Sequence, residues 1–238
     1  MSSRPVAALL LAALLTSCLP RPATRTQVTR SPEPDTMRFL ALGDSYTIGE
    51  GVADADRWPT QLAALLRGRG VAIAEPEIVA RTGWTADELD TAIARATPVG
   101  RYALVTLLIG VNNQYRHRPP EEYRAQFAAL LRQAVGFAGS EAGRVIVLSI
   151  PDWGVTPFAT GQDRARIAEE IDRFNAISRE ESERAGARFV DVTLISRAAA
   201  KSPAARFTTD GLHPSRTLYA AWAEATLPEA LAALGAAR

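Results

Sequence analysis

The sequence has very few residues of the kinds that build disulfides and metal sites. Its 238 residues include one cysteine, Cys18, and two histidines, His117 and His213. A single thiol cannot close a disulfide within the chain, and two distant histidines do not make a ligand set with it. We therefore expect no intrachain disulfide, no metal site and no cofactor.

An excess of charge of either sign is also lacking. Lysine and arginine number 27 against 26 aspartates and glutamates, which gives a formal net charge of +1. This balance provides no basic surface for nucleic acid or for an anionic membrane. Hydrophobic residues make up 47% and charged residues 22% of the chain, as is ordinary for a soluble fold.

The first eighteen residues have the pattern of an export signal that ends at the cysteine. After the basic Arg4, the apolar run Val6 to Leu15 is too short to span a bilayer but suits a signal-peptide core. The segment Leu15-Thr-Ser-Cys18 resembles a bacterial lipobox, in which the cysteine is lipidated; the alternative is an ordinary signal peptide with an incidental cysteine. We expect a signal peptide over 1–17, then lipidated Cys18 and a flexible tether rich in Pro, Thr and Arg over 18–36. The protein would then be an exported lipoprotein, anchored to a membrane of the cell envelope.

The remaining residues, 37–238, alternate apolar strands with amphipathic helices and show no repeat and no second domain. The predicted strands are 38–42, 72–80, 102–109, 144–150 and 188–192; the predicted helices are 59–69, a short one after Thr85, 121–138, 163–185 and 214–234. Apolar strands joined by helical crossovers form a parallel sheet with helices on both faces. We expect an α/β protein, a three-layer α/β/α sandwich whose five-stranded parallel sheet has the flavodoxin-like order 2-1-3-4-5.

Two short segments at opposite ends of this domain carry the groups of a nucleophilic site. Gly43-Asp44-Ser45 follows the first strand, which places the Ser45 hydroxyl at the carboxyl edge of the sheet, where ligands of such sheets bind. Asp210 stands three residues before His213, just ahead of the last helix. A serine hydroxyl needs an imidazole to take its proton at neutral pH, and the imidazole needs a carboxylate to orient it. The structural alternatives are a plain turn at Ser45 and a capping role for Asp210.

Two further segments follow the second and third strands and complete a recognisable set. Gly83 lies in Arg-Thr-Gly-Trp-Thr85, and Asn112 lies in Gly-Val-Asn-Asn113. With Ser45 and His213 in this order, the chain resembles the SGNH hydrolases, also called the GDSL esterase/lipase family, from about residue 38 to its end. Two positions depart from the family pattern: Tyr46 stands where leucine is common, and Asn113 where aspartate is common. Neither departure removes a catalytic atom, but both bear on substrate preference.

The resemblance implies a serine esterase that hydrolyses carboxylic esters through an acyl-enzyme. It assigns the catalytic triad to Ser45, His213 and Asp210, and the oxyanion donors to the backbone N–H groups of Ser45 and Gly83 and the side-chain amide of Asn112. The substrate would be a lysophospholipid or other acyl ester, an acyl thioester, or an O-acetyl group on a glycan. A small closed site would favour acetyl, and an open apolar groove would favour long acyl chains.

Three further residues are candidates for the site, and the sequence allows two other functions. We expect Asn113 and Trp153 to contact substrate, although Trp153 could equally seal the core; His117 is a rival base. The alternatives for the whole chain are a non-catalytic envelope lipoprotein that uses the fold to bind a glycan or a protein, and a flavin or phosphate binder. For the last, Asp44 would repel the phosphate.

Overall fold

The structure, a computed structural model, describes residues 36–199 and 207–236, which belong to one compact unit, Pro34–Arg238. The expected signal peptide, Cys18 and the tether up to residue 35 lie outside the described residues. Among the residues described, no helix has both the length and the apolar character needed to cross a bilayer.

Five parallel strands form the centre of this unit, in the order β2-β1-β3-β4-β5. The strands are β1 (Phe39–Asp44), β2 (Glu77–Arg81), β3 (Leu104–Leu108), β4 (Val145–Leu148) and β5 (Arg188–Val190). Every residue of β1, β3 and β4 is buried, as expected for central strands that are covered on both faces. The predicted fold class and strand order are confirmed.

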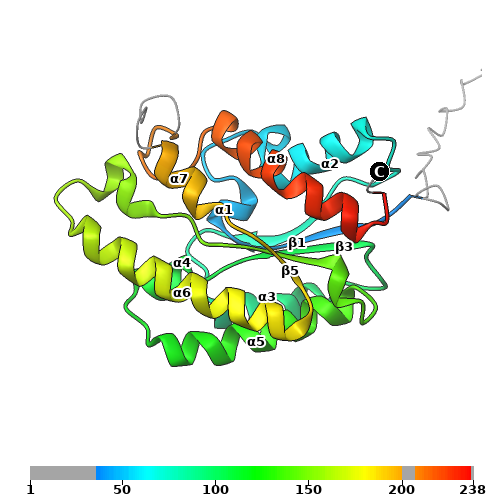
Figure 1. The fold of residues 1–238 in the computed structure, drawn as a ribbon, viewed down its shortest axis with the longest axis horizontal. Helices are drawn as coiled ribbons and strands as arrows, with labels where there is room; N and C mark the ends of the chain where they lie inside the picture. Colours follow the sequence, from blue (N-terminus) through cyan, green and yellow to red (C-terminus); the bar gives the residue numbers. More distant parts are fainter. Residues whose placement is uncertain (1–35, 200–206, 237–238) are drawn as a thin grey trace, which may run out of the picture. The chain divides into compact units, whose positions relative to one another are not determined.

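Helices cover both faces of the sheet (Figure 1). The described helices are α1 (Ser45–Ile48), α2 (Trp58–Gly68), α3 (Ala86–Ala96), α4 (Val111–Tyr115), α5 (Pro120–Phe137), α6 (Arg164–Ala185), α7 (Thr193–Ala199) and α8 (Arg216–Ala233). Figure 1 shows α2 and α8 over one face and α3, α5 and α6 over the other. Apolar stripes predicted from the sequence face the sheet, and Leu62, Phe127 and Trp222 are fully buried there.

The structure differs from the sequence-based elements in two respects. The second strand begins at Glu77, directly after Pro76, and of the preceding segment only Ile73 forms a bridge, with Met37. Proline has no N–H to contribute to a ladder, which accounts for the late start. The short helices α1, α4 and α7 were not predicted, because helices of four to seven residues are too short to show a helical period.

Candidate active site

Ser45 lies where the first strand becomes a helix. Asp44 ends β1, Ser45 begins α1, and the Asp44 side chain accepts a hydrogen bond from the Tyr46 N–H at 3.0 Å. Gly43 is required at this turn, because a Cβ there would lie 2.1 Å from the Thr47 hydroxyl and 2.5 Å from the Leu108 carbonyl oxygen. The turn therefore holds Ser45 at the carboxyl edge of the sheet.

The register of the sheet brings the three predicted loops together. Asp44 at the end of β1 pairs with Arg81 at the end of β2, and Gly43 pairs with Leu108 at the end of β3. The segments that follow these strand ends carry Ser45, Gly83 and Asn112. Because parallel strands end at one edge, these three blocks, far apart in sequence, emerge side by side.

A tight loop holds the aspartate and histidine of the fourth block. Phe207 and Pro214 form an antiparallel bridge that closes it, and the Thr208 N–H donates to the His213 carbonyl at 2.8 Å. Within the loop, Asp210 Oδ1 accepts the N–H groups of Leu212 and His213 at 2.8 and 3.0 Å. Asp210 Oδ2 lies 2.6 Å from His213 Nδ1.

This carboxylate is held ionised by its neighbours. Burial by itself raises the pKa of Asp210, but hydrogen bonds from His213, Thr208 and two backbone N–H groups outweigh it and hold the pKa well below its ordinary value. A carboxylate can only accept a hydrogen bond, so the proton of a neutral His213 lies on Nδ1 and Nε2 is free to accept another.

The folded chain brings the serine and histidine segments into contact. The rings of Tyr46 and His213 lie 5.3 Å apart between centroids, and a Cβ on Gly51 would come within 2.9 Å of Thr208. Ser45 and His213 line one cavity of about 150 Å³, which we call the catalytic cavity. Its lining is Ser45, Tyr46, Val111, Asn112, Tyr115, Trp153, Phe158, Leu212 and His213.

Helix α4 connects this cavity to the loop that carries Gly83. Asn112 lines the cavity, and its amide donates one hydrogen bond to the Trp84 carbonyl at 2.9 Å; among the described residues no partner is seen for the second N–H of this amide. Arg116, the C-cap residue directly after α4, donates to the Gly83 carbonyl at 2.6 Å. Gly83 has φ +85°, a conformation that favours glycine, and it is not among the residues lining the cavity.

A model of the GDSL-like lipase/acylhydrolase family matches residues 41–221, a span that runs from the first strand into the last helix. The chain belongs to this family. The predicted SGNH/GDSL identity is thus confirmed, and the protein is a member of a hydrolase family. No curated protein matches the chain.

Several solved structures share the fold. TesA has a TM-score of 0.63 at 18% identity, covering 83% of this chain and 100% of its own. Axe2, an acetylxylan esterase from Geobacillus stearothermophilus, has a TM-score of 0.63 at 19% identity, covering 82% of this chain and 94% of its own. The psychrotrophic esterase EstA from Pseudoalteromonas sp. has a TM-score of 0.58 at 16% identity, covering 80% and 94%. At these identities the likeness is one of fold.

Of the two residues expected to contact substrate in this GDSL hydrolase, Trp153 lines the catalytic cavity and Asn113 does not. Trp153 lines the catalytic cavity and is also 6% exposed, so it serves as cavity wall and as core. Asn113 does not line the cavity: it is fully buried, its Oδ1 accepts the Ala86 N–H and its Nδ2 donates to Gln126. The expectation for Asn113 is corrected, because its amide joins the start of α3 to α5.

Sequence reasoning missed several residues of the catalytic cavity, chiefly Tyr115 and Phe158. Both are half-exposed aromatic side chains that pack with Trp153, at centroid distances of 5.4 and 6.1 Å from it. Tyr115 ends the five-residue helix α4 and Phe158 lies in a single 3₁₀ turn, elements too short to show a period, so only the large aromatic side chains could have indicated these positions. The rival base His117 lines a neighbouring cavity and not the catalytic one.

Asp44 is an acid buried behind the nucleophile. Its side chain is fully buried, and Oδ2 has no hydrogen-bond partner among the described residues. Burial raises the pKa of Asp44 to about 7, while hydrogen bonds from the N–H groups of Tyr46 and of Asp44 itself lower it less. The Asp44 carboxyl group therefore holds its proton more tightly in the folded protein than in the unfolded chain.

We expect Asp44 to make the free energy of unfolding fall as the pH rises from about 4 to about 7. In that window the folded protein retains a proton that the unfolded chain has lost, so one group contributes a slope of up to about 1.4 kcal/mol per pH unit. The contribution of this proton to stability is fully present below the ordinary pKa of an aspartate, and it is lost as the pH rises through the raised pKa of the folded protein. Urea titrations of the wild type and of Asp44→Asn at a series of pH values measure this, and the variant should show the shallower slope. Parallel slopes in the two proteins would contradict the prediction.

Proposed function

We propose that this GDSL hydrolase is a serine esterase that cleaves carboxylic esters through an acyl-enzyme. Ser45 attacks the ester carbonyl, His213 takes the hydroxyl proton and returns it to the leaving alcohol, and Asp210 orients and stabilises the imidazolium. The observation that carries the proposal is that Ser45 shares one cavity with a His213 whose Nδ1 is bonded to Asp210.

We propose that the oxyanion is held by the backbone N–H groups of Ser45 and Gly83 and by the Asn112 amide. Asn112 lines the cavity and uses one amide N–H on Trp84, which supports its part, and the positive φ of Gly83 supports a close approach of its backbone. Each such donor is typically worth about 2.7–4 kcal/mol of barrier. Water then hydrolyses the acyl-enzyme.

We propose a short acyl group, acetyl in the first place. A catalytic cavity of about 150 Å³ holds only a few heavy atoms beside the reacting carbon, and three aromatic side chains close one side of it. The likeness to an acetylxylan esterase is consistent with an acetyl ester; a long acyl chain would need an apolar groove. The test is hydrolysis of p-nitrophenyl acetate and p-nitrophenyl palmitate by the full-length chain and its Ser45→Ala variant. Acetate should be the better substrate; absence of any hydrolysis would favour a non-catalytic binding protein.

Arg116 should act as a positioning residue for the oxyanion loop. Asn112 and Arg116 lie one helical turn apart and bind the successive carbonyls of Trp84 and Gly83, so α4 holds the loop at two points. We expect Arg116→Ala to lower kcat for p-nitrophenyl acetate about tenfold with little change in KM, because misplaced donors act mainly in the transition state. Arg116→Lys should recover part of the loss.

The matched control for this substitution is Arg118→Ala. Both arginines form an ion pair with the first turn of α3: Arg116 with Glu88, and Arg118 with Asp87. Unlike Arg116, Arg118 makes no bond to the Gly83 loop in the described part of the chain. Equal losses in the two variants would mean that the ion pairs to α3, and not the bond to Gly83, account for the effect.

We also propose that Cys18 is lipidated and anchors the enzyme to a membrane of the cell envelope. The apolar run before it and the lipobox-like Leu15-Thr-Ser-Cys18 support this. Cys18→Ser should move the protein from the membrane fraction to the soluble fraction, as judged by immunoblotting. Retention of the variant on membranes would reject the lipid anchor.

A further inference from the structure

Tyr46 stands directly after the nucleophile, at the position where leucine is common in the family. Its side chain is 3% exposed and lines the catalytic cavity. The Tyr46 ring lies 5.3 Å from the His213 ring, measured between centroids, with 55° between the ring planes. This distance is within the range of packed aromatic pairs, so the residue next to the nucleophile packs against the catalytic base.

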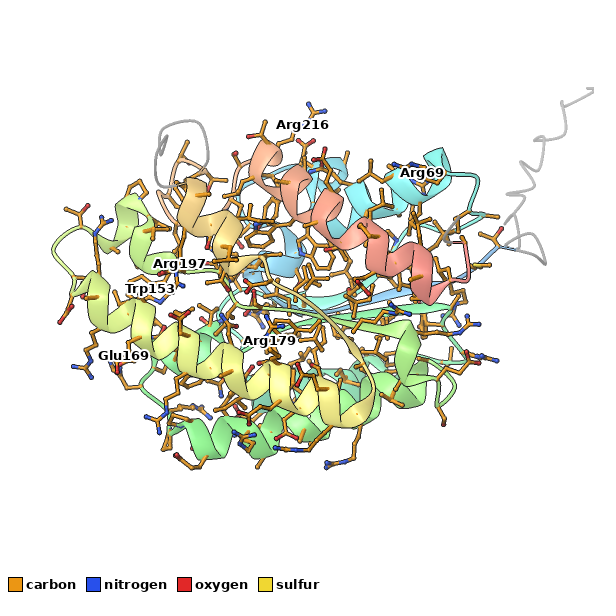
Figure 2. The ribbon with its side chains drawn as sticks, viewed as in Figure 1. Arg69, Trp153, Glu169, Arg179, Arg197 and Arg216 are labelled. Carbon is orange, nitrogen blue, oxygen red and sulfur yellow. The ribbon has the colours of Figure 1, made fainter. Side chains whose placement is uncertain are left out.

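Tyr46 belongs to a series of four rings in contact that leads from the catalytic cavity into the core beneath α8. The centroid of Trp222 lies 5.9 Å from that of Tyr46, and the centroid of Tyr219 lies 5.4 Å from that of Trp222. Trp222 and Tyr219 are fully buried residues of α8. Figure 2 shows side chains filling the space between the sheet and α8, which begins at the labelled Arg216. Because this core is close-packed, the Tyr46 ring has little freedom to move away from His213.

The imidazole of His213 needs a second contact besides Asp210. The 2.6 Å bond from Nδ1 to Asp210 Oδ2 fixes one direction, but it leaves the ring free to pivot about that bond. Such a pivot would move Nε2 away from Ser45, and proton transfer requires a separation of about 2.6–3.2 Å. Among the rings that the structure describes, only Tyr46 is paired with His213, and this contact restricts the pivot.

Tyr46 also joins the two catalytic segments directly. It is covalently bonded to Ser45, and its own N–H donates to Asp44 Oδ1 at 3.0 Å, which fixes its backbone with the turn that carries the nucleophile. A further support of the histidine loop comes from a different element: the Phe158 N–H donates to the Gly211 carbonyl at 3.0 Å. The Phe158 segment does not carry the nucleophile, so the Tyr46 contact is the one that relates the base to the serine.

The Tyr46 hydroxyl keeps its proton, so the ring adds no charge beside the base. Burial raises the pKa of Tyr46 well above its ordinary value, and the negative charges of Asp44, Asp210 and Asp152 raise it further. The contact with His213 is therefore one of packing between neutral rings. A leucine side chain ends at its δ carbons and lacks the outer half of the tyrosine ring, so leucine here would leave part of this space unfilled.

We propose that Tyr46 is a positioning residue for the catalytic base: its ring, supported by Trp222, holds the His213 imidazole where it can take the proton of Ser45. The inference rests on the proposed esterase function and deepens it, since it names the side chain that fixes the geometry of the proton transfer. A misplaced imidazole slows the chemical steps more than it weakens substrate binding. Because His213 transfers a proton in both acylation and deacylation, kcat is affected whichever step limits the rate.

The kinetic test removes the ring and keeps an apolar side chain. Tyr46→Leu should lower kcat and kcat/KM for p-nitrophenyl acetate equally, each by at least about tenfold, whereas Tyr46→Phe, which keeps the ring, should retain most of both. Tyr46→Met, whose flexible side chain fills more of the space without a ring, replaces Tyr46→Leu if that variant does not fold, and it should show the same loss. Wild-type kcat in a variant without the ring, or a Tyr46→Phe enzyme as slow as Tyr46→Leu, would overturn the proposal.

The matched control is Tyr219→Leu. Tyr219 is the same type of residue, is fully buried and contacts the same tryptophan, but it is not paired with His213 and does not line the catalytic cavity. Its replacement should lower the free energy of unfolding, measured by urea denaturation, while kcat stays within about threefold of the wild type. Equal losses of kcat in Tyr219→Leu and Tyr46→Leu would assign the effect to the packing of α8 in general and reject the positioning role.

A measurement without turnover separates this inference from the esterase function. The proton between His213 Nδ1 and Asp210 Oδ2 is followed by NMR, with its downfield resonance assigned from its loss in His213→Ala. We expect this proton to exchange with water at least about tenfold faster in Tyr46→Leu than in the wild type or in Tyr219→Leu, because a less restricted imidazole opens more often. Faster exchange, without any ester hydrolysis by the wild type, would leave the positioning role standing and reject the esterase. Hydrolysis by the wild type, with equal exchange in wild type and Tyr46→Leu, would reject the positioning role alone.

Discussion

Replacing Ser45 by alanine is expected to lower kcat/KM for p-nitrophenyl acetate by at least about a thousandfold, or about 4 kcal/mol of transition-state stabilisation. Without Oγ no acyl-enzyme forms, and the remaining oxyanion donors can only assist direct attack by water. The measurement is steady-state hydrolysis, together with mass spectrometry of acid-quenched enzyme, in which the acyl group should appear on Ser45 in the wild type only.

The structure indicates that this substitution leaves the fold intact. Ser45 begins α1, but the helix is capped by Asp44 and the turn depends on Gly43, so the hydroxyl carries neither role. Denaturation curves of wild type and variant should therefore coincide. Thr160→Ala, which removes an exposed hydroxyl outside both cavities, is the control and should keep the wild-type rate. A Ser45→Ala protein with wild-type activity would reject the nucleophile.

The two histidines should differ in their effects by orders of magnitude. His213→Ala removes the group that takes the serine proton, and we expect a loss of at least about a thousandfold in kcat/KM for p-nitrophenyl acetate. His117 lines a neighbouring cavity and not the catalytic one, so His117→Ala should cost less than about tenfold with this substrate.

The His213 assignment depends on the contact between two segments that are distant in sequence. His213 packs against Tyr46 and bonds Asp210, whereas His117 lies two residues after α4, has φ +53° and lines a neighbouring cavity. The hydrolysis rates of the His213→Ala and His117→Ala variants are measured in parallel, at saturating substrate for kcat and at limiting substrate for kcat/KM. The reverse ranking, with His117→Ala the more damaging, would exchange their roles.

Much of the fold could be predicted because its signals are local. Continuous apolar runs such as that of β4, separated by helical stripes, specify a parallel sheet once the chirality of crossovers is included. The site could be located for the same reason: Ser45, Gly83 and Asn112 each follow a strand end, and adjacent parallel strands end at one edge.

Where the side chains of short, irregular segments point was not predictable. Asn112 and Asn113 are neighbours of the same type, yet one lines the catalytic cavity and the other is buried against α3 and α5. Which of them faces the ligand is set by how the five residues of α4 pack, and a helix that short has no period to read.

By itself the sequence determined the order of the strands, the identity of the nucleophile, acid and base candidates, and the family, since these depend on residue types at set spacings. The tertiary structure alone decided that the His213 loop closes over Tyr46, that Tyr115 and Phe158 join Trp153 in one wall, and that this wall separates a small cavity from a larger polar one. The physical reason is that these contacts join segments far apart in the chain, and their geometry comes from packing and buried hydrogen bonds that no local pattern encodes.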